Sequence, residues 1–150
     1  MNTTVMISPL LIARCALTKD IVSYNASQGQ HWSHKSKSTQ QKKIWATLLR
    51  SSEGLDIPVS QGNHRRMLKV TRVTTGKMHL FEKVNLYAAV KPVEDALVDL
   101  GWLTDDSLKY CELVVEQFHA AYAPEWLQED VIARKVKIAV EIFDLNDSIQ

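Results

Sequence analysis

Apolar residues recur at alternating steps of four and three between residues 86 and 100, which is the spacing of one helical face. The positions are Leu86, Val90, Val93, Leu97 and Leu100. Asn85 stands before them as a candidate N-cap, and Gly101 follows them at the position where many helices end. The pattern therefore predicts a helix over Asn85–Leu100.

Pro92 interrupts this pattern, because it lacks a backbone N–H and crowds the carbonyl of Ala88. The penalty inside a regular helix is about 3 kcal/mol. Two alternatives follow. Either the helix kinks at Pro92, or a short turn over Asn85–Lys91 precedes a helix that begins at Pro92.

Alternating and β-prone runs predict the rest of the fold. The expected strands are Thr3–Ser8, Arg65–Thr74, Cys111–Phe118 and Lys135–Phe143, and a first helix is expected at Thr39–Ser51. Leu10–Leu17 fits either an extension of the first strand or its hairpin partner, and residues 118–134 resemble a loop with a helical turn. We expect an α+β fold in a single domain of residues 1–150, with a small mixed or antiparallel sheet of about four strands and two main helices.

Composition narrows the class of protein. Cys15 and Cys111 are far apart and form no disulfide framework, so we expect a reducing, cytoplasmic compartment. No apolar run approaches the roughly 20 residues of a membrane span, and residues 8–17 lack the basic segment of a secretory signal. The five histidines come without a Cys-x-x-Cys pair, which argues against a zinc site.

Charge is divided unevenly along the chain although the net charge is only +1. Residues 31–91 hold twelve Lys or Arg and three acids, a net +9, whereas residues 92–130 hold ten acids and one base, a net −9. The basic half could face the phosphates of nucleic acid, or the two halves could pair within the fold. The expected DNA contacts are Lys35, Lys37, Arg65, Arg66, Lys69, Arg72 and Lys77.

The strand at residues 64–74 has basic residues on both faces. Exposed Arg65, Lys69 and Arg72 would form a stripe suited to a phosphate backbone. A solvated strand whose charges prevent edge-to-edge aggregation is the equal alternative.

Residues 85–107 resemble the core pattern of the RusA family of Holliday-junction resolvases. The matching residues are Asn85-Leu86, Lys91-Pro92, Asp95-Ala96-Leu97, Gly101 and Asp105-Asp106-Ser107. The resemblance implies a small homodimeric endonuclease that cuts four-way DNA junctions in recombination and repair, often encoded by phages or prophages. It also implies a Mg²⁺ cofactor, for which Mn²⁺ is the expected substitute.

The same resemblance implies which residues form the site. It also shows one position where this chain departs from the family's pattern. Family nucleases typically show Asp-x-Asp-Asn before the helix, where this chain has Glu82, Lys83, Val84 and Asn85. Glu82, Lys91, Asp105 and Asp106 are the implied catalytic residues, with Glu82 and Asp106 as the implied metal ligands. Val84 offers no ligand atom, and Lys83 adds a charge that repels a cation.

Two functions are consistent with these residues. The first is a Mg²⁺-dependent endonuclease on branched DNA, weakened by Val84. The second is a non-catalytic protein of the same fold that binds branched DNA or a protein partner. Without the resemblance, Asp105-Asp106-Ser107 would be interpreted as a turn capped by aspartate side chains.

Overall fold

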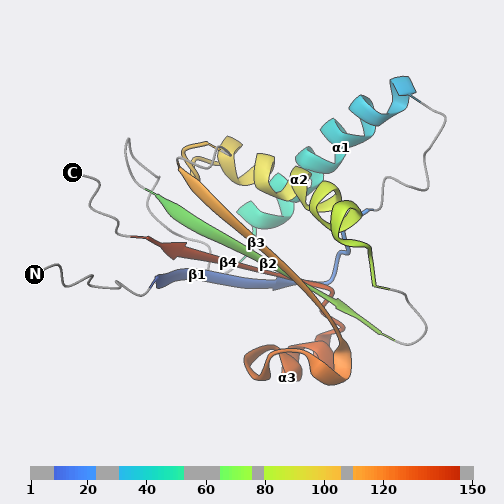
Figure 1. The fold of residues 1–150 in the computed structure, drawn as a ribbon, viewed down its shortest axis with the longest axis vertical. Helices are drawn as coiled ribbons and strands as arrows, with labels where there is room; N and C mark the ends of the chain where they lie inside the picture. The colour runs from blue at the N-terminus through green and yellow to red at the C-terminus, as the bar shows by residue number, and fades with distance from the viewer. Residues whose placement is uncertain (1–8, 23–30, 53–64, 76–79, 106–109, 146–150) are drawn as a thin grey trace, which may run out of the picture.

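A four-stranded mixed sheet forms the centre of the computed structural model, and helices cover both of its faces (Figure 1). The structure describes residues 9–22, 31–52, 65–75, 80–105 and 110–145, and within α1 it describes side chains from Thr39 onward. The elements in chain order are β1 (Leu10–Leu17), α1 (His31–Arg50), β2 (Arg66–Thr74), α2 (Lys83–Asp99), β3 (Cys111–His119), the 3-10 turn η2 (Ala120–Tyr122), α3 (Glu125–Arg134) and β4 (Ile138–Asp144). The predicted α+β class and the mixed sheet are confirmed.

The strand order is β1-β4-β2-β3, so β2 lies inside the sheet while β1 and β3 lie at its edges. β2 and β3 are parallel, whereas β4 is antiparallel to both of its neighbours. Parallel neighbours need a crossover connection, which α2 supplies. The start of α2 therefore lies near the end of β2, and its end lies near the start of β3 (Figure 1).

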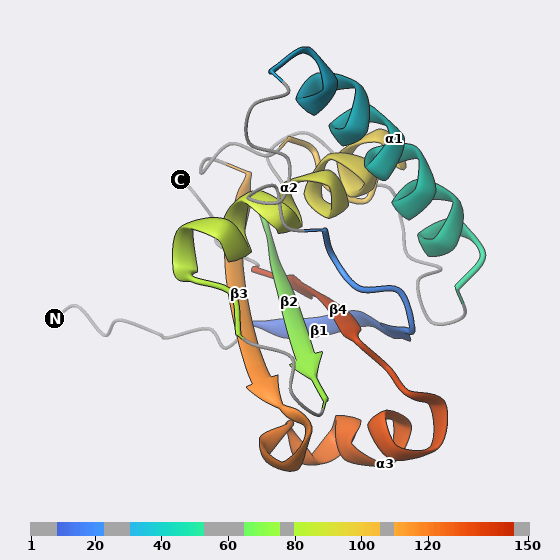
Figure 2. The same cartoon turned by 90° about the vertical axis from the view of Figure 1, so that its right-hand side faces the viewer.

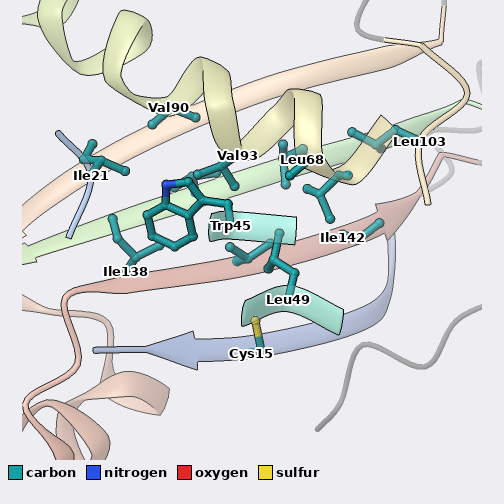
Figure 3. Packing of buried hydrophobic residues seen from close by; sticks show 14 of the residues in the cluster. Cys15, Ile21, Trp45, Leu49, Leu68, Val90, Val93, Leu103, Ile138 and Ile142 are labelled. Carbon is teal, nitrogen blue, oxygen red and sulfur yellow. The ribbon is translucent and has the colours of Figure 1, made fainter. Parts of the chain in front are cut away.

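The main core lies between the sheet and the two long helices (Figure 3). Trp45 and Leu49 of α1 pack over β4 and β1, beside Ile138 and Cys15, and the apolar face of α2 packs over β2 and β3 (Figure 3). A smaller cluster on the opposite face lies under α3 and includes Leu127, Val131 and Val73. Within the described ranges, no helix combines the length and apolar character that crossing a membrane requires.

α2 confirms the predicted helical face and corrects its start. Leu86, Val90, Val93 and Leu97 are all buried. Asn85 is not the N-cap, since the helix begins at Lys83 and Glu82 takes that position. The helix runs through Pro92, so the alternative of a helix beginning at Pro92 is wrong.

The end of α2 follows the prediction for Gly101, which adopts a φ of 81°. The Gly101 N–H donates to the carbonyl of Val98 at 3.0 Å, and the Trp102 N–H donates to that of Leu97 at 3.0 Å. This pair of bonds is the Schellman arrangement, and it requires a residue that tolerates a positive φ.

Other boundaries differ from expectation for local reasons. α1 begins at His31, eight residues before the predicted Thr39, in a stretch that contains few apolar residues to mark a helical face. β4 begins at Ile138 rather than Lys135, because Lys135 has a φ of 54° and ends α3. The predicted strand Thr3–Ser8 lies outside the described residues, and the first described strand is β1, Leu10–Leu17.

The expectation of a loop over residues 118–134 was wrong, since ten of them form α3. Leu127 and Val131 lie four residues apart and are both buried, so one short apolar face anchors the helix. Glu125 in its first turn and Arg134 in its last turn suit the helix dipole.

Candidate functional site

The entry to α2, where Glu82 lies, is held at the ends of β2 and β3 by contacts of Phe81 with Gln117 and Arg72, which we call the clasp. The Phe81 N–H donates to Oε1 of Gln117 at 3.0 Å, and Nε2 of Gln117 donates back to the Phe81 carbonyl. The Arg72 guanidinium lies 3.8 Å above the Phe81 ring. Glu82 follows this clasp directly and is exposed, so its position is set by Phe81 while its carboxylate faces solvent.

Arg72 is the centre of the clasp and is 1% exposed. Its Nε and Nη2 donate to the two carboxylate oxygens of Asp20 at 2.9 and 3.0 Å. Its Nη1 lies 3.4 Å from Oε1 of Gln117. Such a bidentate pair occupies most hydrogen-bond donors of the buried guanidinium, so few N–H groups remain for a ligand. The prediction that Arg72 faces DNA was wrong, because β2 is an interior strand and this face lies under the helical layer.

The turn that contains Asp105 lies at the other end of the sheet. Nη1 of Arg66 donates to the Trp102 carbonyl at 2.7 Å, and the Arg66 N–H donates to the Tyr110 carbonyl at 3.0 Å. Arg66 and Arg72 are six residues apart on one strand, which separates these two anchor points by about 20 Å.

The length of α2 gives the same separation. Its 17 residues span about 25 Å, with Glu82 before the first turn and Asp105 beyond the last. One chain therefore does not bring Glu82 and Asp105 together, and the described members of the expected catalytic set, Glu82, Lys91 and Asp105, are spread along the length of α2. Asp106 lies outside the described residues. Among the residues that are described, no three His, Cys, Asp or Glu side chains gather as a metal site.

Lys91 lies halfway along α2, away from both ends. Its Nζ is 3.3 Å from Oε1 of Glu94 and 3.3 Å from Oδ1 of Asp95. The Glu94 side chain is only 6% exposed, and the Cys111 thiol lies 3.8 Å from its other oxygen. Lys91 thus balances a nearly buried carboxylate, which is a structural role, and 46% of its own side chain still faces solvent.

The proposed basic stripe on β2 is also corrected. Arg66 is 2% exposed, and burial lowers the pKa of its guanidinium. Lys69 pairs with Glu116 of β3 at 3.5 Å, and Arg65 is half-buried. With Arg66 and Arg72 buried, Arg65, Lys69 and Arg72 do not form an exposed stripe. Lys77 lies outside the described residues, as do the side chains of Lys35 and Lys37.

α1 is instead the helix that carries basic residues and no acid, and it lies in the helical layer on one face of the sheet (Figure 2). Its twenty residues include Lys35, Lys37, Lys42, Lys43 and Arg50 and contain no acid. Lys43 and Arg50 are exposed, while Lys42 pairs with Asp99 of α2 at 3.1 Å. Lys43 and Arg50 were not among the expected DNA contacts, although the absence of acids from residues 31–50 is visible in the sequence.

A separate cleft of about 740 Å³ runs along β1, between the end of α1 and α3. It is lined by Arg14, Cys15, Ala16, Leu17, Ser51, Ser52, Trp126, Asp130 and Arg134. The Arg14 guanidinium stacks 3.8 Å above Trp126 and bonds to Glu141 at 2.7 Å. Arg134 lies 4.0 Å from Asp130. Each arginine of the cleft is paired with an acid, Arg14 with Glu141 and Arg134 with Asp130, which weakens its attraction for a phosphate.

Comparisons with known proteins gave no match. No protein-family model, no curated protein and no solved structure matches this chain. The resemblance of residues 85–107 to the RusA family therefore stays a prediction.

Proposed function

We propose that this protein is a RusA-like endonuclease that binds branched DNA through α1 and cleaves it weakly. The observation that supports binding is the composition and position of α1, which has five basic residues, no acid and a place on the outer surface. Phosphate contacts of this kind supply most of the affinity of proteins for nucleic acid. The resemblance of residues 85–107 to RusA supports branched DNA as the substrate.

The catalytic part of the proposal requires two chains. Glu82 and Asp105 lie at opposite ends of α2, so two copies with antiparallel α2 helices would place one copy's Glu82 toward the other copy's Asp105. A divalent ion such as Mg²⁺, or Mn²⁺ in its place, would be held between those carboxylates and would supply charge stabilisation at the phosphate. Cys15 and Cys111 are both buried and form no disulfide, which suits the reducing interior of a cell and a cytoplasmic protein.

A non-catalytic protein that binds branched DNA is the second candidate. It is favoured by the entry to α2, where Val84 is 81% exposed and offers no oxygen. Lys83 beside it is also exposed and would repel a cation. The two candidates share the DNA-binding surface and differ only in the metal site.

The decisive experiment mixes a labelled four-way junction with the protein and Mg²⁺ or Mn²⁺, and scores both binding and cleavage. We expect the junction to bind more tightly than a linear duplex of the same sequence, and the native protein to cleave slowly. Val84→Asp restores a third carboxylate and should increase cleavage at least tenfold, whereas Asp106→Asn should abolish it in either background.

Three outcomes would change this proposal. Cleavage that survives Asp106→Asn would refute the assignment of the carboxylates. Junction binding without cleavage in both the native protein and Val84→Asp would favour the non-catalytic protein. Equal affinity for junction and duplex would remove the resolvase-like specificity altogether.

A further inference from the structure

β1 is an edge strand, and the cleft described above runs along its outer side. β4 pairs with the inner side of β1, and no strand pairs with the outer side among the residues that the structure describes. The cleft is lined by four consecutive residues of the strand, Arg14–Leu17, by Ser51 and Ser52 at the end of α1, and by α3. α1 and α3 cover opposite faces of the sheet (Figure 2), so they form the two walls of the cleft.

The backbone groups of Arg14 and Ala16 point out of the sheet into this cleft. The Lys137 N–H donates to the Leu17 carbonyl at 2.9 Å, so the bonding groups of Leu17 face β4. These groups alternate from one side to the other along a strand, so Cys15 also faces β4, whereas Arg14 and Ala16 face outward. Each of the two offers one N–H donor and one C=O acceptor, which is what the main chain of an extended partner requires.

The second half of β1 keeps this edge accessible to another backbone. Edge strands are commonly protected by a lysine, a proline or a bulge. The register shift of β1 lies between Leu11 and Ala13, so the pairing with β4 from Ala13 to Leu17 is regular. Residues 13–17 contain no lysine or proline, and three of the five are alanine or cysteine. Their short side chains leave room for a second main chain beside the strand.

Charge on the α3 wall selects the side chains of an occupant. Trp126, Asp130 and Arg134 are four residues apart, so they form one face of α3 along the cleft. The Arg134 side chain is 61% exposed, and its 4.0 Å from Asp130 is longer than a hydrogen bond. With Arg14, the lining residues include two arginines and one aspartate, a net charge of +1. A carboxylate that faces α3 therefore finds a cation in Arg134, whereas an amine meets two arginines.

The α1 wall selects for hydrogen-bond donors. The Ser51 hydroxyl donates to the Thr47 carbonyl at 3.0 Å, and the Ser52 hydroxyl donates to the Leu48 carbonyl at 2.7 Å. A hydroxyl has one proton to donate, so each serine oxygen can only accept from an occupant. A side chain with its own O–H group, such as threonine, suits this wall.

We propose that the cleft binds an extended acidic segment of a partner protein, which adds a fifth strand to the four-stranded sheet beside β1. Side chains of the segment alternate between the walls, with carboxylates toward Arg134 and hydroxyl groups toward Ser51 and Ser52. Main-chain bonds to β1 supply the affinity, and the side chains supply the selectivity. The inference does not depend on the proposed function, because none of the expected catalytic residues lines the cleft.

Fluorescence anisotropy with labelled synthetic peptides tests the class of occupant, without DNA or metal. The probe has eight residues, the length of β1, and alternates threonine with aspartate. We expect it to bind at least tenfold more tightly than the same peptide with lysine in place of aspartate. Equal affinity of these two peptides, or no binding of the acidic peptide at about 1 mM, would overturn the proposal.

Backbone methylation tests the strand geometry. All N–H groups of the threonines point to one side of an extended peptide, and all those of the aspartates point to the other. N-methylation of the threonines in one peptide and of the aspartates in another should therefore weaken binding at least tenfold in one case and leave it nearly unchanged in the other. Two methylated peptides that both bind like the parent would rule out main-chain pairing and overturn the proposal.

Variants of the protein place the peptide on the β1 edge. Ala16→Pro removes an N–H that faces away from β4, a position where an edge strand tolerates proline, and should weaken binding of the acidic peptide at least tenfold. Ala16→Ser keeps the N–H and is the matched control, with urea titration to compare the folding of both. Arg134→Gln should weaken binding at least threefold, whereas Lys135→Asn removes a neighbouring cation outside the cleft lining and should not. Native affinity in both Ala16→Pro and Arg134→Gln would overturn the proposal.

Sedimentation without peptide tests whether a second copy of the chain occupies the edge instead. We expect no self-association that depends on Ala16. A dimer that Ala16→Pro dissociates and Ala16→Ser retains would assign the β1 edge to a second copy, and the proposal of an acidic partner segment would then be wrong.

Discussion

β2 and α1 are both basic and acid-free, yet they place their charges in opposite environments. β2 includes Arg66, Lys69 and Arg72, of which the two arginines are at most 2% exposed. α1 includes five Lys or Arg, and Lys43 and Arg50 point into solvent. The difference comes from position in the layers, because β2 lies between β4 and β3 and under the helices, whereas α1 packs on the sheet with one side and leaves its other side open to solvent.

The comparison separates two uses of a cation. Arg72 is held by the two oxygens of Asp20, the ring of Phe81 and the amide of Gln117, and thereby fixes the entry to α2. Lys43 is exposed, so its side chain can reach a phosphate. A run of basic residues in a sequence therefore predicts a charged element, but not whether the charge serves the fold or a ligand.

The largest expected effect comes from Arg72→Ala. This change leaves the Asp20 carboxylate without its partner and removes the contact with Phe81, so it should lower the free energy of unfolding by about 3–5 kcal/mol. Lys43→Ala is the matched control on α1 and should change stability by less than about 0.5 kcal/mol. Urea titration measures both. A loss below about 1 kcal/mol for Arg72→Ala would show that the two elements are energetically alike.

A smaller effect on the free energy of unfolding is expected from a rise in pH. It tests how closely the buried face of α1 covers Cys15 of β1. Cys15 lies under the end of α1, where burial raises the pKa of its thiol from 9.0 to about 11. The folded protein keeps the thiol neutral, whereas the unfolded chain ionises it above about pH 9. The contribution of the buried thiol to the free energy of unfolding is therefore complete below about pH 9 and is lost as the pH rises toward about 11. Over this range the free energy of unfolding falls by about 1.4 kcal/mol per pH unit at most.

Cys15→Ala isolates this contribution, since every other titrating group is shared with the native protein. The difference in unfolding free energy between the two proteins should shrink between about pH 9 and about pH 11. A difference that stays constant over this range would mean that the thiol is reached by solvent and that α1 covers β1 less closely than the structure shows.

The smallest effect on stability is expected from the outer face of α1. Lys43→Gln combined with Arg50→Gln should change the unfolding free energy by less than about 0.5 kcal/mol. The same pair should weaken junction binding and reduce the slope of log affinity against log salt by about two, because up to two phosphate contacts are lost. Lys135→Asn is the control, since it removes an exposed cation far from α1 at a positive φ that asparagine tolerates. An equal loss of junction affinity in the double variant and in Lys135→Asn would show that α1 is not the DNA-binding surface.

The sequence by itself determined the elements whose apolar periodicity is local. The face of α2, its end at Gly101, and the strands β2 and β3 to within a residue followed from spacing and from glycine chemistry. The first turns of α1 and most of α3 were not predicted from the sequence. In α1 the reason is that few apolar residues mark a helical face there.

The tertiary structure alone decided which charges are exposed and which acids can meet. The strand order buries Arg72, and no local pattern contains that order because it depends on contacts between distant segments. Glu82 and Asp105 are 23 positions apart in the sequence, but a helix of about 25 Å lies between them in space. A motif records spacing along the chain, whereas chemistry at a site requires proximity, and α2 is the rigid element that separates the two.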